Sequence, residues 1–288
     1  MRKLIGTGLQ AIGAVSPRLG GRLAFGLWRR PLARGRVRDS ELDVHTAARV
    51  EAVDGGVLTY AWGDGTRPVL LVHGWRSRAS RYAGFITRLL ELGYSPVSYD
   101  APGHGDSPGP IVSILGHQRI IRALEERHGP FEAVIAHSLG VPFALYAVKE
   151  GVATKRLVMV SGVADFGYLA DSFCRELGLG PKVNQRLRRE IERGYFDGDH
   201  TIWDRFSVAT GKTPLLVVHN DEDDVVDPEQ ARVLLLNYGE HAHLHPTTGL
   251  GHSRILQDPA VIAEAVAFLQ DSDGLQDSDV SEGLDLSA

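Results

Sequence analysis

The stretch AVIAHSLG, residues 133–140, decides how this chain folds. Its first four residues form a short apolar run typical of a buried strand, and residues 139–150 have the pattern of a helix. Ser138 therefore stands at a tight strand-to-helix turn, with the small residues Ala136 and Gly140 two places before and after it. Such a turn projects the serine side chain, and the helix N-terminus favours developing negative charge. The alternative role for Ser138 is that of a helix N-cap.

Around this turn, strand-like apolar runs alternate with segments of helical periodicity. Strands are predicted over residues 56–62, 68–72, 94–100, 133–136, 156–160 and 214–218, and helices over 80–92, 114–128, 139–150, 228–237 and 259–269. This alternation predicts an α/β fold whose mostly parallel sheet is covered by helices on both faces. Ligands of such sheets bind at the carboxyl ends of the strands. The residues that follow each strand are therefore the candidates for a functional site.

The alternation stops between Ser161 and Gly211, a stretch too long for a loop in a compact domain. We interpret residues 162–210 as a small helical lid inserted after a core strand. Its seven aromatic residues favour a substrate with an apolar group. Basic residues gather between Lys182 and Arg193, and we interpret them as the solvated face of the lid; the alternative is an anion site.

A serine hydroxyl is a poor nucleophile and needs a base, which in turn needs an orienting acid. Two downstream loops offer these groups. HNDEDDVVDP, residues 219–228, follows a predicted strand and holds five acids, and GLGHS, residues 249–253, precedes the last predicted helix. The chain order serine, acid, histidine is a known arrangement in parallel-sheet enzymes. The sequence therefore predicts His252 as the base and an acid from residues 221–227.

Together these motifs resemble the α/β-hydrolase family, in its branch of small bacterial esterases and lipase-like enzymes, over about residues 50–269. The family's G-x-G-H motif matches at residues 249–252. Its acid-loop pattern, H-G-x-x-D-x-x-V-P, aligns so that the resemblance implies Asp223 as the acid, with Asp221 and Asp224 as competitors. The loop matches the pattern at His219, Asp223 and Val226 and departs from it at Asn220, in place of glycine, and at Asp227, in place of proline.

The family also places its oxyanion-hole donors by motif. The first donor belongs to the residue after H-G, and His73-Gly74-Trp75 follows the predicted strand 68–72. The resemblance thus implies the backbone N–H groups of Trp75 and Leu139 as the two donors. The run DAPGHGDS, residues 100–107, resembles a turn that marks the fold, so we expect His104, like His73 and His137, to be a supporting residue.

The resemblance implies cleavage of a carboxylic ester through an acyl-enzyme on Ser138, with a small-molecule acyl substrate and no cofactor. One alternative is thioester hydrolysis or acyl transfer on the same triad. Another is a non-catalytic ligand-binding protein on a hydrolase scaffold. No metal site is expected: the alternating histidines of residues 241–245 have no acid or cysteine partner, and we interpret them as belonging to a strand near the sheet edge.

Composition bounds the remaining expectations. The net charge of −5 argues against a nucleic-acid partner, and the single cysteine, Cys174, favours a reducing, cytoplasmic compartment. The first 38 residues hold nine Lys or Arg and no acid. We interpret residues 1–48 as a basic helical arm packed on the hydrolase domain, residues 49–270; the alternative is peripheral contact of residues 1–38 with an anionic membrane. The acidic tail, residues 271–288, is expected to be disordered.

Overall fold

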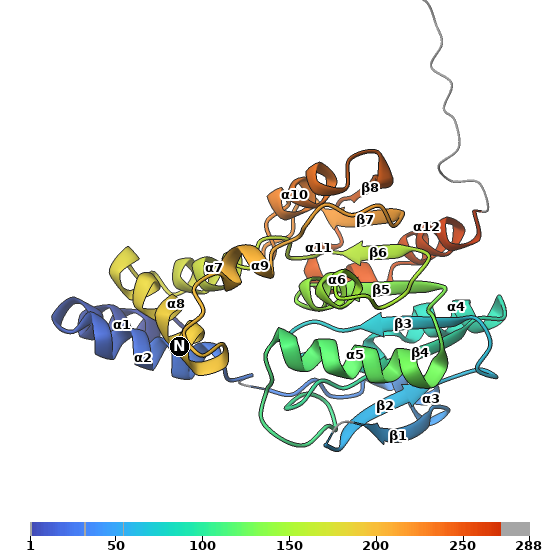
Figure 1. The fold of residues 1–288 in the computed structure, drawn as a ribbon, viewed down its shortest axis with the longest axis horizontal. Coiled ribbons are helices and arrows are strands. Elements are labelled where there is room, and N and C mark those ends of the chain that lie inside the picture. Colours follow the sequence, from blue (N-terminus) through green and yellow to red (C-terminus); the bar gives the residue numbers. More distant parts are fainter. Residues whose placement is uncertain (1, 32, 54, 272–288) are drawn as a thin grey trace, which may run out of the picture.

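The computed structural model describes residues 2–31, 33–53 and 55–271, so the predicted disordered tail lies outside the described residues except for Asp271. In these residues an eight-stranded sheet has the order β1-β2-β4-β3-β5-β6-β7-β8 (Figure 1). β1, β2 and β4 pair antiparallel, and every pairing from β4 to β8 is parallel. The strands are β1 Arg49–Val53, β2 Val57–Ala61, β3 Pro68–Val72, β4 Ser95–Tyr99, β5 Ala133–His137, β6 Leu157–Val160, β7 Leu215–Asn220 and β8 Ala242–Thr247.

The inner strands are largely apolar because both of their faces are buried. Every residue of β3, β5, β6 and β7 is buried. Successive side chains point to opposite faces. Along β3, Leu70 and Val72 pack into one core cluster, whereas Val69 and Leu71 pack into the other.

Helices cover both faces of the sheet, so the predicted α/β class is confirmed (Figure 1). One core cluster includes side chains of α5, α6 and α10, and the other includes side chains of α4 and α12. These helices are α4 Ala83–Glu91, α5 Ile114–His128, α6 Gly140–Lys149, α10 Glu229–Tyr238 and α12 Pro259–Gln270.

The two strands at the sheet edges differ from the inner ones in burial. β1 exposes four of its five residues, so no apolar run marks it in the sequence. β8 carries His243 and His245 at the other edge. Within the described residues no group of three His, Cys, Asp or Glu side chains is placed to hold a metal ion.

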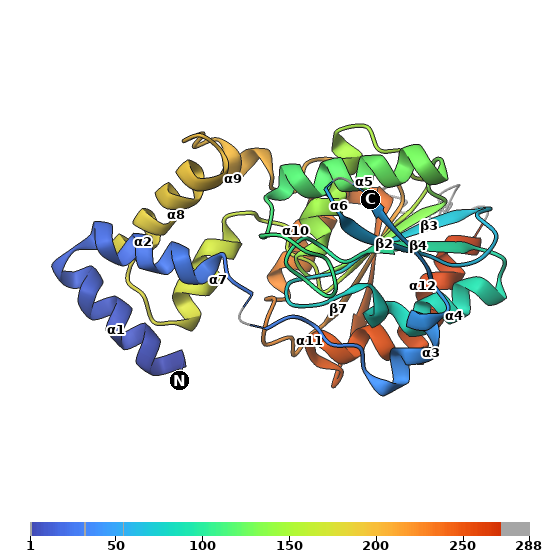
Figure 2. The same cartoon turned by 90° about the horizontal axis from the view of Figure 1, so that it is seen from below.

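A separate helical lobe stands beyond the carboxyl ends of the parallel strands (Figures 1 and 2). We call it the cap. Part of it is the segment between β6 and β7, which forms α7 Tyr168–Glu176, α8 Pro181–Tyr195 and α9 Ile202–Arg205. The other part is the N-terminal pair α1 Arg2–Val15 and α2 Pro17–Trp28, which packs along α8. The cap is thus built from two segments far apart in the sequence.

Glycines allow the N-terminal helices to approach α8 closely. A Cβ added at Gly13 would stand 2.3 Å from Cγ2 of Val183, and one at Gly21 would stand 2.4 Å from Cβ of Arg186. The predicted arm of residues 1–48 therefore divides: α1 and α2 join the cap, while α3, Leu42–Thr46, contacts α4 on the sheet domain. Among the residues that the structure describes, no helix is long and apolar enough to cross a bilayer.

Candidate active site

Ser138 stands at the carboxyl end of β5 in a strained backbone conformation. Its φ is +56°, in the left-handed region that side chains other than glycine rarely adopt. The turn is tight because Gly140 packs on β3, where an added Cβ would stand 2.3 Å from the carbonyl oxygen of Val72. The cap position of α6 is Leu139, and no side chain caps that helix. The N-cap alternative for Ser138 is therefore wrong.

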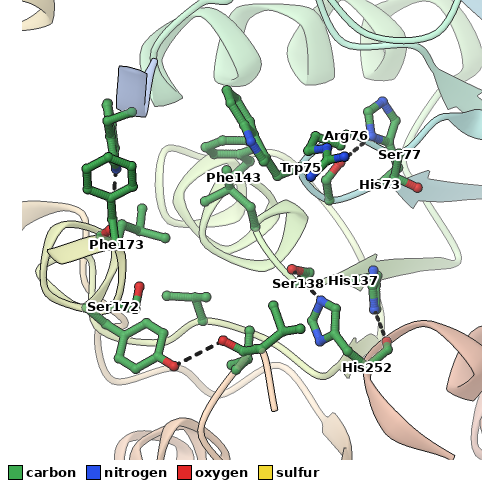
Figure 3. A pocket seen from close by; sticks show the side chains of 18 of the residues that line it. His73, Trp75, Arg76, Ser77, His137, Ser138, Phe143, Ser172, Phe173 and His252 are labelled. Carbon is green, nitrogen blue, oxygen red and sulfur yellow. Dashed lines mark hydrogen bonds between the residues drawn. The ribbon is translucent and has the colours of Figure 1, made fainter. Parts of the chain in front are cut away.

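His252 lies between Ser138 and Asp223 and is hydrogen-bonded to both. Its Nε2 is 3.0 Å from Oγ of Ser138, and its Nδ1 is 2.8 Å from Oδ2 of Asp223. Figure 3 shows the imidazole facing the serine hydroxyl. A carboxylate only accepts hydrogen bonds, so Nδ1 carries the proton, and Nε2 is left to accept the proton of the hydroxyl. This tautomer is the one that a general base at Ser138 requires.

Asp223 is held as an ionised carboxylate. Its Oδ1 accepts the backbone N–H groups of Val225 and Val226, each at 2.9 Å. Burial alone would raise the pKa of Asp223, but the hydrogen bond and charge of His252, together with the two backbone donors, lower it to about 2. Asp221 and Asp224, the competing carboxylates, are exposed, and His252 bonds to Asp223.

The loops that carry Asp223 and His252 are tied to each other. Oδ1 of Asn220 accepts the backbone N–H of Leu250 at 3.0 Å, and Oε2 of Glu222 accepts that of Gly249 at 3.0 Å. Asn220 is the residue that replaces the family's glycine, and its side chain is fully buried in this role. The departure from the motif therefore contributes to the register of the histidine loop.

The backbone at Gly74 lies against the candidate nucleophile, since an added Cβ would stand 2.8 Å from Cβ of Ser138. His73 holds this backbone. Its Nε2 accepts the N–H of Ala101 at 3.0 Å, so Nδ1 carries the proton and donates to the carbonyl oxygen of Gly74 at 2.8 Å. That carbonyl and the N–H of Trp75 belong to one peptide unit. His73 therefore sets the orientation of a group that the sequence nominates for the oxyanion hole.

Two further buried histidines support the site. His137 donates from Nε2 to the carbonyl oxygen of His252 at 2.9 Å, and burial, with the neighbouring His252, lowers its pKa to about 3. The ring of His104 packs edge-on against Trp75 with centroids 5.0 Å apart, and burial lowers its pKa to about 4. Both rings are thus neutral near pH 7.

A cavity of about 1200 Å³ extends from Ser138 under the cap. In Figure 3, Phe143 and Trp75 lie near Ser138, and Phe173 lies across the cavity. The sequence did not predict that the N-terminal helices reach it, yet Trp28 lines it and donates from Nε1 to the carbonyl oxygen of Leu169 at 3.3 Å. The apolar lining from the cap comprises Ile5, Leu27, Trp28, Phe166, Leu169, Phe173, Leu177 and Phe196.

The model of the alpha/beta hydrolase family matches residues 69–265, and the chain therefore belongs to this family. No curated protein matches the sequence significantly. Solved structures agree in fold. A monoacylglycerol lipase of Paleococcus ferrophilus has a TM-score of 0.57 at 23% identity, over 74% of this chain and 98% of its own. Esterase RhEst1 of a Rhodococcus species has a TM-score of 0.55 at 16% identity, over 78% and 99%. Mouse alpha/beta hydrolase domain-containing protein 10 has a TM-score of 0.59 at 14% identity, over 78% and 97%.

Proposed function

We propose that this protein is a serine hydrolase that cleaves carboxylic esters through an acyl-enzyme on Ser138. The observation that carries the proposal is the hydrogen-bonded series Ser138 Oγ, His252 and Asp223, at 3.0 and 2.8 Å. A nucleophile, a base in the required tautomer and an ionised orienting acid are the three groups that such chemistry needs.

In the proposed reaction, His252 takes the proton of the Ser138 hydroxyl as Oγ attacks the ester carbonyl carbon. The oxyanion that forms is received by the backbone N–H groups of Trp75 and Leu139, and Asp223 stabilises the imidazolium. His252 then gives its proton to the leaving alkoxide, and the alcohol departs. Water, deprotonated by His252, attacks the acyl-enzyme, and the acid is released as Ser138 regains its proton.

The cavity supports an apolar acyl group as the substrate moiety. Its cap side is lined by aromatic and aliphatic side chains, among them Phe173 and Trp28, and its volume of about 1200 Å³ exceeds the usual range for small ligands. An acetyl group would contact only a small part of this apolar surface. We therefore expect kcat/KM to rise with acyl length from two carbons to medium chains.

The test is a matched series of p-nitrophenyl esters of increasing acyl length, with thioesters and anilides of the same acids. We expect steady-state turnover of the esters, and a loss of at least about 10⁴-fold in kcat/KM for Ser138→Ala. Ser172→Ala, a second serine that lines the cavity, is the matched control and should stay within about twofold of wild type.

Two outcomes would favour the alternatives. Thioester turnover that exceeds the matched ester by about 100-fold in kcat/KM would identify a thioesterase on the same triad. An absence of both a burst and steady-state turnover with every substrate would identify a ligand-binding protein on the hydrolase scaffold.

A further inference from the structure

The outer surface of α1 and α2 exposes large apolar side chains to solvent. Leu4 is 79% exposed and Val15 is 90% exposed on α1, and Leu19 and Leu23 are 49% and 43% exposed on α2. Five of the eleven large apolar side chains that are exposed in the described part of the chain belong to these two helices, Ile12 being the fifth. Burying these side chains would be favourable, and the fold does not do so.

The apolar side chains follow the helical repeat. Leu4, Ala11 and Val15 share one exposed face of α1 at intervals of seven and four residues. On α2 the exposed Leu19 and Leu23 lie four residues apart, beside a row formed by Arg18 and Arg22. An apolar stripe flanked by basic side chains is the pattern of a helix that lies in the interface of a membrane.

The charge of this segment favours an anionic partner. Residues 2–38 hold nine Lys or Arg and no Asp or Glu. The side chain of Arg22 is 72% exposed and its nearest carboxylate oxygen, on Glu190, is 3.9 Å away, so most of its charge faces water. The adjoining helix α8 adds the exposed Lys182 and Arg189 to the same lobe.

Other side chains of the same helices line the cavity. Ile5 on α1 and Leu27 and Trp28 on α2 line it, and Arg30, just after α2, stands at its exposed rim. One pair of helices thus carries both the solvent-facing apolar stripe and part of the lining of the space that leads to Ser138. A molecule that enters the cavity beside α2 would come from whatever surface this stripe covers.

We propose that α1 and α2 dock on an anionic lipid bilayer, with the exposed leucines in the headgroup layer, and that the cavity takes its apolar acyl ester from that bilayer. The second half of this proposal rests on the proposed function, whereas the docking itself does not. Apolar contact and electrostatic attraction add in such binding, because neither four apolar side chains inserted in the headgroup layer nor a basic patch alone gives stable attachment.

The binding test is co-sedimentation of the full chain with vesicles of phosphatidylcholine and phosphatidylglycerol, and with vesicles of phosphatidylcholine alone. We expect partition into the anionic vesicles only, weakened by salt. Combined Leu4→Ser, Val15→Ser, Leu19→Ser and Leu23→Ser should lower the partition coefficient by at least about tenfold, and Arg18→Gln by about fivefold.

Matched controls lie on the sheet domain. Leu236→Ser on α10 removes a side chain that is 81% exposed, and Arg232→Gln removes one that is 74% exposed; neither should change the partition. Equal binding to neutral vesicles would overturn the requirement for an anionic bilayer, and equal loss with the control variants would overturn docking through α1 and α2. A wild-type chain that never sediments with vesicles but dimerises through this face would assign the stripe to a second copy instead.

Turnover separates the two halves of the proposal. The four-serine variant should hydrolyse a soluble short-chain p-nitrophenyl ester as wild type does, because its changes lie outside the cavity lining, and should lose at least about tenfold on a long-chain ester held in anionic vesicles. Equal loss on both substrates would contradict delivery from the bilayer. Vesicle binding without turnover of any ester would retain the docking and overturn the proposed function.

Discussion

Nδ1 of His73 donates a hydrogen bond to the carbonyl oxygen of Gly74 at 2.8 Å, while its Nε2 accepts from Ala101 at 3.0 Å. The ring is buried, which lowers its pKa and keeps it neutral, so this pair of contacts persists at neutral pH. The peptide that His73 holds carries the N–H of Trp75. In the proposed mechanism this N–H donates a hydrogen bond to the oxyanion. In that proposed mechanism, His73 is a positioning residue for the group that receives the oxyanion.

Replacing His73 should affect the transition state more than substrate binding. We expect His73→Leu to lower kcat by on the order of 10- to 100-fold with KM little changed, because the Trp75 peptide loses its anchor. His73→Asn keeps a donor where Nδ1 stood and should retain more activity. The check is kcat and KM for a soluble ester together with the affinity of a boronate that forms a tetrahedral adduct with serine; a boronate affinity equal to that of wild type in His73→Leu would refute the role.

The acid loop offers a test with controls of the same residue type. Asp223→Asn should lower kcat by on the order of 10³- to 10⁴-fold, because an amide stabilises the wrong tautomer of His252 and not its imidazolium. Asp221→Asn and Asp224→Asn change exposed carboxylates and should stay within about twofold. Ester hydrolysis kinetics of the three variants decide the matter, and a larger loss for Asp224→Asn would move the acid one residue along the chain.

The pH dependence follows from the charge state of Asp223. Its pKa of about 2 lies below the ordinary value of 3.8, so the carboxylate stays ionised as the pH falls to about 4. His137, with a pKa of about 3, stays neutral over the same range. Neither Asp223 nor His137 therefore takes up a proton above about pH 4, and the acid limb of log kcat/KM against pH should be no steeper than a slope of one. A slope of two above pH 4 would mean that a second group of the site takes up a proton.

Cap stability depends on the glycine contacts of α2. Gly21→Ala should destabilise the protein by about 1–3 kcal/mol, since its Cβ would meet Cβ of Arg186 at 2.4 Å. Gly26 lies on the same helix with no atom within 4 Å of an added Cβ. Gly26→Ala should therefore be neutral or stabilise by up to about 1 kcal/mol. Urea unfolding compares the two, and equal effects would argue that the close approach of α2 and α8 is not a stabilising contact.

Much of the sheet could be predicted because the inner strands are buried on both faces and leave continuous apolar runs, as in residues 68–72 and 133–136. β1 could not, because its exposed side chains carry no such signal. The packing of α1 and α2 on α8 could not be predicted from the sequence either, because its close contacts are made by glycines, which give no apolar periodicity.

Some residues of the candidate site could likewise be predicted from the sequence, and others could not. Ser138 and His252 follow from local motifs, because a tight turn and a loop before a helix leave their pattern in neighbouring residues. Asp223 could be chosen only by aligning its loop with the family's acid-loop pattern, because five acids stand within seven residues. Asn220 acts through a contact with Leu250, 30 residues along the chain, and His73 through a contact with Ala101, 28 residues along. The spacing of residues in the sequence alone does not reveal such contacts.

The assignment of Ser138 as the nucleophile is tested most directly by peptide mass spectrometry, which locates the covalent adduct of a fluorophosphonate. We expect one adduct per chain, on the peptide that carries Ser138, and none in Ser138→Ala, whose ester turnover should fall to background while Ser172→Ala reacts as wild type. An adduct on another residue, or a Ser138→Ala protein that still hydrolyses esters at the wild-type rate, would contradict the assignment of Ser138 as the nucleophile.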